Sequence, residues 1–315
     1  MKFSLIASCF LLAVTAFAAS PTWTTPSKVA VAAFSVDDYI HVYYGYDLKD
    51  LQRTREHKDV FVDSLFSRVN RKYPGKRTFK TYNRRDYSAR RDDYKNAVLY
   101  RSEIVFFSGH GDQQRICLQD YPINISEGCG SDVCAPDEYG KIYSGDVRWV
   151  IFDACLVLNI NKSNKLEYPL SNSVVDITKF NKLKEVFGGV HAILGFSSIS
   201  WEKYRMNIEG YFAKSETLYN YFTEKFIDYD ETIWDAFSLA SGEIVRDFSI
   251  LPNPQGLTPA IAFLRGYDAN GRYHDTSKER FNHTFNQPIQ INGSLEMYVK
   301  YDEYGDAEYY PTIYF

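Results

Sequence analysis

Five apolar runs of strand length constrain the fold of this chain more than any other feature. The first run, KVAVAAFSV at residues 28–36, is almost continuously apolar. A second run, IVFF, lies within residues 97–107, and three more follow at residues 148–155, 190–196 and 258–264. Continuous apolar character, rather than alternation, is typical of strands that are buried on both faces of a sheet. We therefore expect a central sheet that is covered on both sides.

Helical patterns lie between these apolar runs. In the clearest helical segment, residues 50–73, apolar residues recur every four positions at Phe61, Leu65 and Val69. Further helices are predicted at residues 180–187, 215–226 and 231–245. Strands that alternate with helices in this order form a mainly parallel sheet with helices on both faces. The predicted fold class is therefore α/β.

The end of the chain has a different pattern. From residue 285 to residue 315 apolar and polar residues alternate, and a turn sequence, EYGD, stands at residues 303–306. This pattern predicts an appended C-terminal β-hairpin. We therefore divide the chain into residues 1–18, an α/β domain at residues 19–270 and a β-rich extension at residues 271–315.

The N-terminus has the features of a secretory signal peptide. It begins with Met1-Lys2, continues with an apolar run at residues 5–18, and ends in the small-x-small sequence Ala16-Phe17-Ala18. The apolar run is too short for a good membrane span. We expect residues 1–18 to be removed and the mature protein to be secreted into an extracellular environment.

The charge balance argues against a nucleic-acid or membrane partner. The chain has 36 Lys and Arg residues against 40 Asp and Glu residues, a formal net charge of −4. Proteins that bind nucleic acids or acidic membranes usually present a basic surface. The basic residues around Arg84 and Arg90 are interleaved with Asp86, Asp92 and Asp93, which is typical of a solvated face.

Removal of residues 1–18 leaves four cysteines: Cys117, Cys129, Cys134 and Cys155. In an oxidising compartment, four cysteines allow two disulfides. The alternative is a single disulfide between Cys129 and Cys134, across a short loop, with Cys155 kept as a thiol and Cys117 left over. The two alternatives differ in function, because only a thiol at Cys155 is able to act as a nucleophile.

Four Asn-x-Ser/Thr sequences follow the signal peptide, and in a eukaryotic secretory route they are acceptors for N-linked glycans on surface loops. They begin at Asn124, Asn161, Asn282 and Asn292.

His110 and Cys155 each follow the end of a predicted buried strand. Side chains at the carboxyl ends of neighbouring parallel strands meet at one edge of the sheet. A thiolate there is a nucleophile, and a nearby imidazole lowers the thiol pKa and later protonates the leaving group. Gly111 leaves its N–H able to point at a developing oxyanion, with the Cys155 N–H as a second donor.

The two motifs resemble those of the caspase, legumain, gingipain and clostripain group of cysteine peptidases. The sequence Ser-Gly-His-Gly at residues 108–111 precedes Asp-Ala-Cys-Leu at residues 153–156, and the offset from His110 to Cys155 is 155 − 110 = 45 residues. The resemblance covers roughly residues 28–268. It implies a caspase-haemoglobinase-like fold, a His110–Cys155 catalytic dyad, a protein or peptide substrate, and no cofactor.

The same resemblance suggests where the substrate side chain binds. In that group the first pocket is built partly from the end of the first strand, where Asp37 and Asp38 stand in this chain. An acidic pocket favours Lys or Arg before the scissile bond. The alternative is that at least one of the pair caps a turn or a helix start. Ser198 and Trp201, after the fourth strand, are candidates for the pocket wall.

The remaining histidines compete with His110 as the catalytic base. His57 lies within a predicted helix and is expected to be solvated, whereas His191 begins a strand and so lies at the wrong edge of the sheet. His274 with Asp268 and Asp275 fits no standard metal-binding spacing, and we expect no metal.

Two other functions fit the same sequence. The first is a catalytically inactive module of this fold that serves extracellular binding. The second is self-cleavage in the polar segment at residues 159–172, which offers Lys162 and Lys165 as sites.

Overall fold

The computed structural model describes a little over half of the chain. The described residues are 28–39, 50–51, 53–94, 102–112, 115–119, 122–124, 147–160, 176–184, 187, 190–198, 203–205, 211–213, 218–248, 258–282, 291–300 and 312–314. The predicted signal peptide, Cys129, Cys134, Asn161, Trp201 and the 303–306 turn lie outside them.

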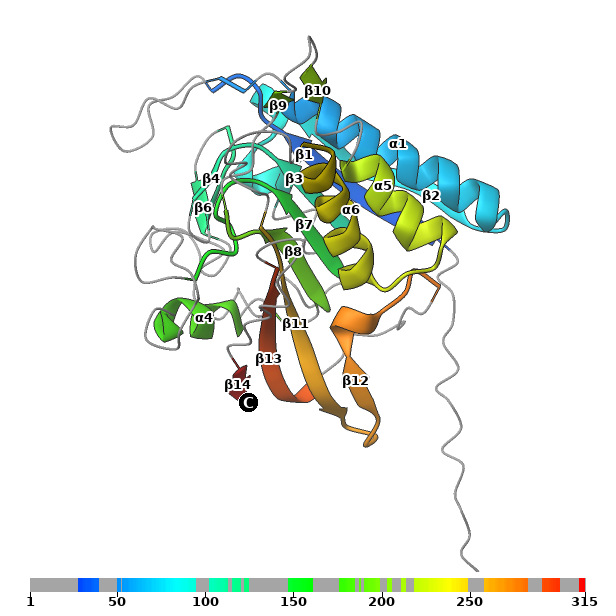
Figure 1. The fold of residues 1–315 in the computed structure, drawn as a ribbon, viewed down its shortest axis with the longest axis vertical. Coiled ribbons are helices and arrows are strands. Elements are labelled where there is room, and N and C mark those ends of the chain that lie inside the picture. The colour runs from blue at the N-terminus through cyan, green and yellow to red at the C-terminus, as the bar shows by residue number, and fades with distance from the viewer. Residues whose placement is uncertain are drawn as a thin grey trace, which may run out of the picture.

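A nine-stranded sheet forms the centre of the molecule (Figure 1). Eight strands follow the order β14-β13-β11-β8-β7-β3-β1-β2, and β12 pairs with β11 off this path. The five strands from β8 to β2 are parallel to one another, whereas β11, β13 and β14 are antiparallel to their neighbours. The strands are β1 (Lys28–Ser35), β2 (Arg77–Arg85), β3 (Ile104–Ser108), β7 (Trp149–Asp153), β8 (Ala192–Phe196), β11 (Pro259–Asp268), β12 (Tyr273–Asp275), β13 (Ile291–Val299) and β14 (Thr312–Tyr314).

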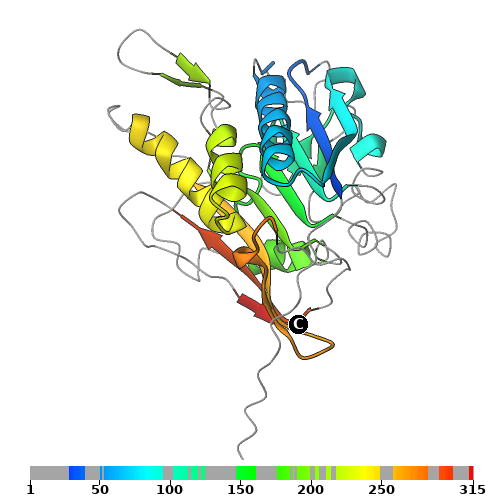
Figure 2. The ribbon, with the colours of Figure 1, turned by 90° about the vertical axis from the view of Figure 1, so that its right-hand side faces the viewer.

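Helices cover both faces of this sheet. On one face α1 (Thr54–Lys72), α5 (Asn220–Thr223), the π-helical turn η4 (Glu224–Asp228) and α6 (Ile233–Phe248) lie side by side (Figures 1 and 2). On the other face α4 (Ile177–Leu183) contributes Phe180 and Leu183 to the apolar core. The predicted α/β class, with a mixed and mostly parallel sheet between helices, is confirmed.

The continuous apolar runs are explained by burial on both faces. In β1, Val29, Val31 and Ala33 pack with α1 and α5, while Ala32 and Phe34 pack in the cluster on the other face. Neither face of this strand is solvated, so alternation has no physical reason to occur. Four of the five predicted strands match β1, β7, β8 and β11, and the fifth, 97–107, is described as β3 from Ile104 onward.

The sequence did not predict β2, which carries RTFKTYNRR and no apolar run. Among the described strands it pairs with β1 alone and stands at the end of the strand order, and its side chains are partly or fully exposed. A polar edge strand lacks the signal that burial gives to central strands.

The predicted C-terminal hairpin is part of the central sheet. β13 pairs along its full length with β11, from Ala260 with Val299 to Asp268 with Ile291, and β14 pairs with β13. Three shorter strands, β4 (Gly111–Asp112), β5 (Arg115–Cys117) and β6 (Pro122–Asn124), form a small separate sheet next to the end of β3. β9 (Lys203–Arg205) and β10 (Tyr211–Ala213) form a two-stranded ribbon.

Within the described residues, none of the helices combines the length and apolar character that crossing a bilayer requires.

The pairing of β11 with β13 depends on a contact between two glycines. Gly266 and Gly293 lie opposite each other, and a methyl group on Gly266 would stand 2.6 Å from the Gly293 Cα. A methyl group on Gly293 would overlap the Arg265 carbonyl oxygen. The backbones approach too closely for a side chain on this face.

We therefore expect Gly293→Ala to lower the free energy of unfolding by about 2–3 kcal/mol, because the two strands must separate locally. Gly75→Ala is the matched control, since a methyl group on Gly75 would have no other atom within 4 Å, and it should change stability by about 0.5 kcal/mol or less. Urea unfolding of both variants measures the difference, and equal stabilities would contradict the close approach.

Candidate active site

The ends of β3 and β7 bring the two predicted catalytic segments together. The strands are parallel neighbours, and Ser108 is in register with Asp153. His110 and Cys155 each stand two residues beyond this pair, and the Gly109 N–H donates to the Asp153 carbonyl at 3.2 Å. Both segments therefore leave the sheet at the same carboxyl edge, as the strand pattern predicted.

Gly111 lies directly against the backbone of the cysteine segment. A methyl group on Gly111 would stand 2.7 Å from both the Ala154 Cβ and the Cys155 carbonyl oxygen, and 2.8 Å from a Val157 methyl. Only glycine fits this close approach without moving the backbone. The segment that carries His110 is therefore packed onto the residues that carry Cys155.

The backbone of His110 is held from both sides. Its N–H donates to the Tyr39 hydroxyl oxygen at 2.8 Å, and its carbonyl accepts from the Cys117 N–H at 3.0 Å. The Tyr39 hydroxyl in turn donates to the Cys117 carbonyl at 3.1 Å, and its ring lies 4.9 Å from the His110 imidazole, centroid to centroid. Tyr39 is thus a central contact of the site that the sequence did not predict.

Cys155 and Cys117 are both thiols, and both are half-buried. Burial raises the pKa of the Cys117 thiol to about 12, with a smaller opposing effect from the Arg115 charge. Cys117 therefore stays protonated at neutral pH and is a poor nucleophile. The predicted partners Cys129 and Cys134 lie outside the described residues.

The segment after Cys155 is anchored to the end of β8. Leu156 adopts a left-handed backbone conformation with a φ of 57°, which is unfavourable for a bulky residue. Its N–H donates to the Ser198 carbonyl at 2.9 Å, and the Leu158 N–H donates to the Phe196 carbonyl at 3.1 Å. Neighbouring contacts of this kind are what allow a strained conformation to persist.

Asp153 sits beneath the site in a buried polar cluster. Its Oδ2 atom lies 2.5 Å from Nδ1 of His57 and accepts from the Ser108 hydroxyl at 2.7 Å. The His57 side chain is only 1% exposed, so the prediction of a solvated His57 is wrong. Because α1 turns this face toward the sheet, His57 reaches across to the end of β7.

This cluster joins three elements at one point. His57 comes from the first part of α1, Ser108 ends β3, and Asp153 ends β7 immediately before Ala154-Cys155. A buried carboxylate is tolerated only when hydrogen-bond donors surround it. Asp153 therefore fixes the strand ends on which His110 and Cys155 depend.

Asp37 serves the start of α1. Its Oδ1 atom accepts from the Thr54 hydroxyl and, at 3.2 Å, from the Arg55 N–H. These contacts satisfy donors of the first helical turn, so the alternative in which one of the aspartates caps a helix is confirmed for Asp37. The neighbouring Asp38 is exposed, and its backbone N–H donates to Asp86 at 3.2 Å.

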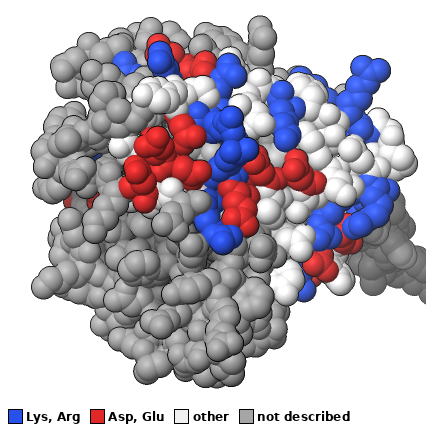
Figure 3. Space-filling view, turned by 90° about the horizontal axis from the view of Figure 1, so that it is seen from above, with Lys and Arg blue, Asp and Glu red and all other residues white. Residues whose placement is uncertain are grey.

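Asp37 also lines an open cavity of about 580 Å³ along α1. Its other lining residues are Arg55, Glu56, Asp59, Val60, Asp63 and Ser64. Figure 3 shows Asp and Glu side chains standing next to Lys and Arg side chains on the described part of the molecule seen from above. The charge of this surface is therefore mixed.

The remaining predicted residues have these positions. The Ser198 side chain is buried, and its hydroxyl oxygen accepts from the Thr258 N–H at 2.9 Å, while Trp201 lies outside the described residues. His191 is buried at the start of β8, with Nδ1 2.7 Å from Glu279 Oε1, at the opposite edge from His110 as expected. Nε2 of His274 lies 3.1 Å from Asp268 Oδ2.

Within the part of the chain that the structure describes, no group of three or more His, Cys, Asp and Glu side chains is arranged to hold a metal ion.

The chain was compared with known proteins. No family model and no curated protein matches it. Among solved structures it is similar to gingipain R, an Arg-specific cysteine proteinase, with 10% identity and a TM-score of 0.40 over 90% of this chain and 66% of that chain. It is also similar to caspase-1 from Spodoptera frugiperda, with 14% identity and a TM-score of 0.38 over 76% of this chain and 89% of that chain. It is similar as well to the Drosophila initiator caspase Dronc, with 9% identity and a TM-score of 0.38 over 82% of this chain and 87% of that chain.

The Asp153 cluster leads to a stability prediction. We expect His57→Leu to lower the free energy of unfolding by about 3–5 kcal/mol, because it removes the imidazole that lies 2.5 Å from the buried Asp153 carboxyl group. The double variant His57→Leu with Asp153→Leu should be more stable than His57→Leu alone, because it replaces both members of this buried polar contact by apolar side chains.

Asp63→Asn is the control, since Asp63 is an exposed carboxylate on the same helix that pairs with Lys80 at 3.2 Å. It should change stability by about 1 kcal/mol or less. Urea unfolding of the wild type, His57→Leu, Asp153→Leu and the double variant gives the coupling free energy, and strictly additive effects of the two cluster substitutions would contradict the direct contact between His57 and Asp153.

Proposed function

We propose that this chain is a secreted cysteine endopeptidase in which Cys155 is the nucleophile and His110 is the general acid–base. One observation carries the proposal: both residues follow the carboxyl ends of the paired strands β3 and β7, and Gly111 packs onto the Cys155 backbone. That arrangement brings the two segments to one edge of the sheet, where a nucleophile and its base have to lie close together. The Cys155 thiol supports it as well.

The proposed reaction has two steps. The Cys155 sulfur attacks the substrate carbonyl carbon, and His110 takes the thiol proton and passes it to the departing amine. Water then attacks the resulting thioester, again assisted by His110, and releases the acid and the thiol. The N–H groups of Gly111 and Cys155 are proposed to stabilise the oxyanion in both steps.

We also propose a preference for Lys or Arg before the scissile bond, with Asp38 as its acidic determinant. Asp37 is engaged at the start of α1, whereas Asp38 is exposed at the same carboxyl edge as β3 and β7. An exposed carboxylate beside a binding site attracts a cationic side chain. Ser198 and Trp201 remain candidates for the wall of this pocket, and secretion through residues 1–18 is likewise part of the proposal.

Alkylation kinetics test the nucleophile. At pH 7.5, iodoacetamide should label Cys155 at least tenfold faster than Cys117, because the pKa of about 12 leaves Cys117 with very little thiolate. His110→Ala should slow labelling of Cys155 and should lower peptide cleavage about 10³-fold or more. Peptide mass spectrometry after timed quenching identifies the modified cysteine.

Cys117→Ala is the control and should retain both cleavage and labelling of Cys155. A protein that cleaves no member of a peptide library, and whose Cys155 reacts no faster than Cys117, would overturn the peptidase proposal. That outcome would instead favour the catalytically inactive binding module.

The two neighbouring aspartates separate substrate preference from stability. Asp38→Asn should lower kcat/KM for Lys and Arg peptides about tenfold, with little change for uncharged peptides. Asp37→Ala should lower the free energy of unfolding by about 1 kcal/mol through loss of the helix contacts. The preference is the kcat/KM for Lys and Arg peptides divided by the kcat/KM for uncharged peptides. The same preference in the wild type and in Asp38→Asn would contradict the role of Asp38 in an acidic pocket.

A further inference from the structure

The lower part of the sheet carries a row of three side chains on one face. Tyr267 in β11 pairs with Tyr273 in β12 on one side and with Asn292 in β13 on the other. Residues directly opposite each other in antiparallel strands project from the same face, with Cβ atoms about 5 Å apart. Tyr273, Tyr267 and Asn292 therefore form a continuous row across three strands.

This row lies beyond the part of the sheet that the helices cover. In Figure 1 the ends of β11, β12 and β13 extend below α5 and α6. Both tyrosines are 55% exposed, with ring centroids 5.3 Å apart, and Asn292 is exposed too. Exposed aromatic rings next to one another form an apolar surface with an amide at its end.

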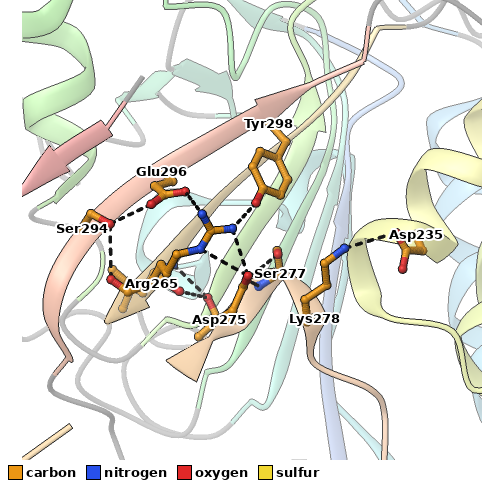
Figure 4. A network of polar contacts seen from close by, with 10 residues as sticks. Asp235, Arg265, Asp275, Ser277, Lys278, Ser294, Glu296 and Tyr298 are labelled. Atoms are coloured by element: carbon orange, nitrogen blue, oxygen red, sulfur yellow. Dashed lines mark hydrogen bonds and ion pairs between the residues drawn. The ribbon is translucent and has the colours of Figure 1, made fainter. Parts of the chain in front are cut away.

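The adjacent row toward the core is already occupied by its own polar contacts (Figure 4). Arg265 bonds to the Asp275 carboxylate and the Tyr298 hydroxyl, and it pairs with Glu296 at 2.7 Å. Ser294 donates to Glu296 at 2.9 Å. Ser294 and Glu296 in this network are still buried, whereas Tyr273, Tyr267 and Asn292 in the next row are exposed to solvent.

Asn292 also begins the sequence Asn-Gly-Ser, an acceptor for N-linked oligosaccharide. In the folded protein the Ser294 hydroxyl is buried and bonded to Glu296, so recognition of this sequence must precede folding. The exposed Asn292 side chain then leaves room for a glycan after folding.

Asn282 offers a contrast within the same chain. Its Nδ2 atom donates to Asp230 at 3.4 Å, and its Oδ1 atom is buried with no hydrogen-bond partner. A glycan on Nδ2 would disrupt this contact and require the partly buried side chain, whose Oδ1 atom is inaccessible, to move. Chains modified at Asn282 are therefore expected to fold poorly, whereas chains modified at Asn292 are not. Asn161 lies outside the described residues, and the Asn124 side chain is not described.

We propose that Asn292 is a glycosylation site whose first sugar packs on the exposed ring of Tyr267. In the transfer, the Asn292 Nδ2 atom bonds to C1 of the sugar, the bond from C1 to the polyprenyl pyrophosphate carrier breaks, and Nδ2 loses one proton. The apolar C–H face of the sugar then covers an aromatic face that is otherwise hydrated. This proposal does not depend on peptidase activity.

Site-resolved mass spectrometry tests the assignment. The full chain is produced in a eukaryotic secretory host, with a second arm in which the host's own signal sequence replaces residues 1–18. We expect the peptide with Asn292 to be mostly glycosylated and the peptide with Asn282 to be mostly unmodified in the secreted protein. An N-glycosidase should convert the glycosylated Asn292 to Asp.

Two variants make the result decisive. Asn292→Gln should lose one glycan in a gel shift, whereas Asn282→Gln should migrate as the wild type does. Secreted, folded protein with an unmodified Asn292, or with a glycan at Asn282, would overturn the assignment.

The packing on Tyr267 has its own test. Enzymatic removal of the glycan should lower the Tm of the wild type by about 2 °C or more, and it should have no such effect in Tyr267→Ala. Tyr229→Ala is the control, because Tyr229 is 61% exposed on a different part of the surface, and it should behave as the wild type does. An unchanged Tm in the wild type would refute the contact between the sugar and Tyr267.

Discussion

The contact between Asp153 and His57 holds together the part of the molecule on which the candidate site depends. Asp153 is buried at the end of β7, where His57 from α1 and Ser108 from β3 supply its polar contacts. The register of β3 with β7 places Ser108 beside Asp153 at the ends of the two strands. The contact with His57 then holds these strand ends against α1. Cys155 follows two residues later, so its position depends on this buried polar contact as well as on its own contacts.

The sequence was sufficient to predict the central sheet because its strands are buried on both faces. β1, β3, β7 and β8 contain apolar runs, and the carboxyl ends of the β3 and β7 runs predicted that the segments carrying His110 and Cys155 leave the sheet side by side. The same reasoning failed for β2, since an edge strand with exposed side chains has no apolar run to mark it. Burial leaves a local pattern in a sequence, whereas edge pairing does not.

The supporting residues of the site were beyond prediction for a different reason. Tyr39 is one of 26 tyrosines, and its role comes from a hydroxyl that reaches the His110 backbone across 71 residues of sequence. His57 reads as a helix residue, and only the docking of α1 on the sheet turns it toward Asp153. Tertiary contacts between distant residues have no local periodicity, so a single sequence does not reveal them.

The backbone around Cys155 is constrained by neighbouring strands rather than by its own sequence. Leu156 has a φ of 57°, which is unfavourable for a bulky residue, and hydrogen bonds to the Ser198 and Phe196 carbonyls hold the segment in place. Gly111 approaches the Cys155 carbonyl too closely for any side chain. Asp86 and Asp230 also adopt positive φ values elsewhere in the fold, so this backbone conformation is compatible with a structural turn as well as with a catalytic one. What the contacts fix is the path of the chain out of β7, which carries Cys155 to the edge of the sheet where the His110 segment lies.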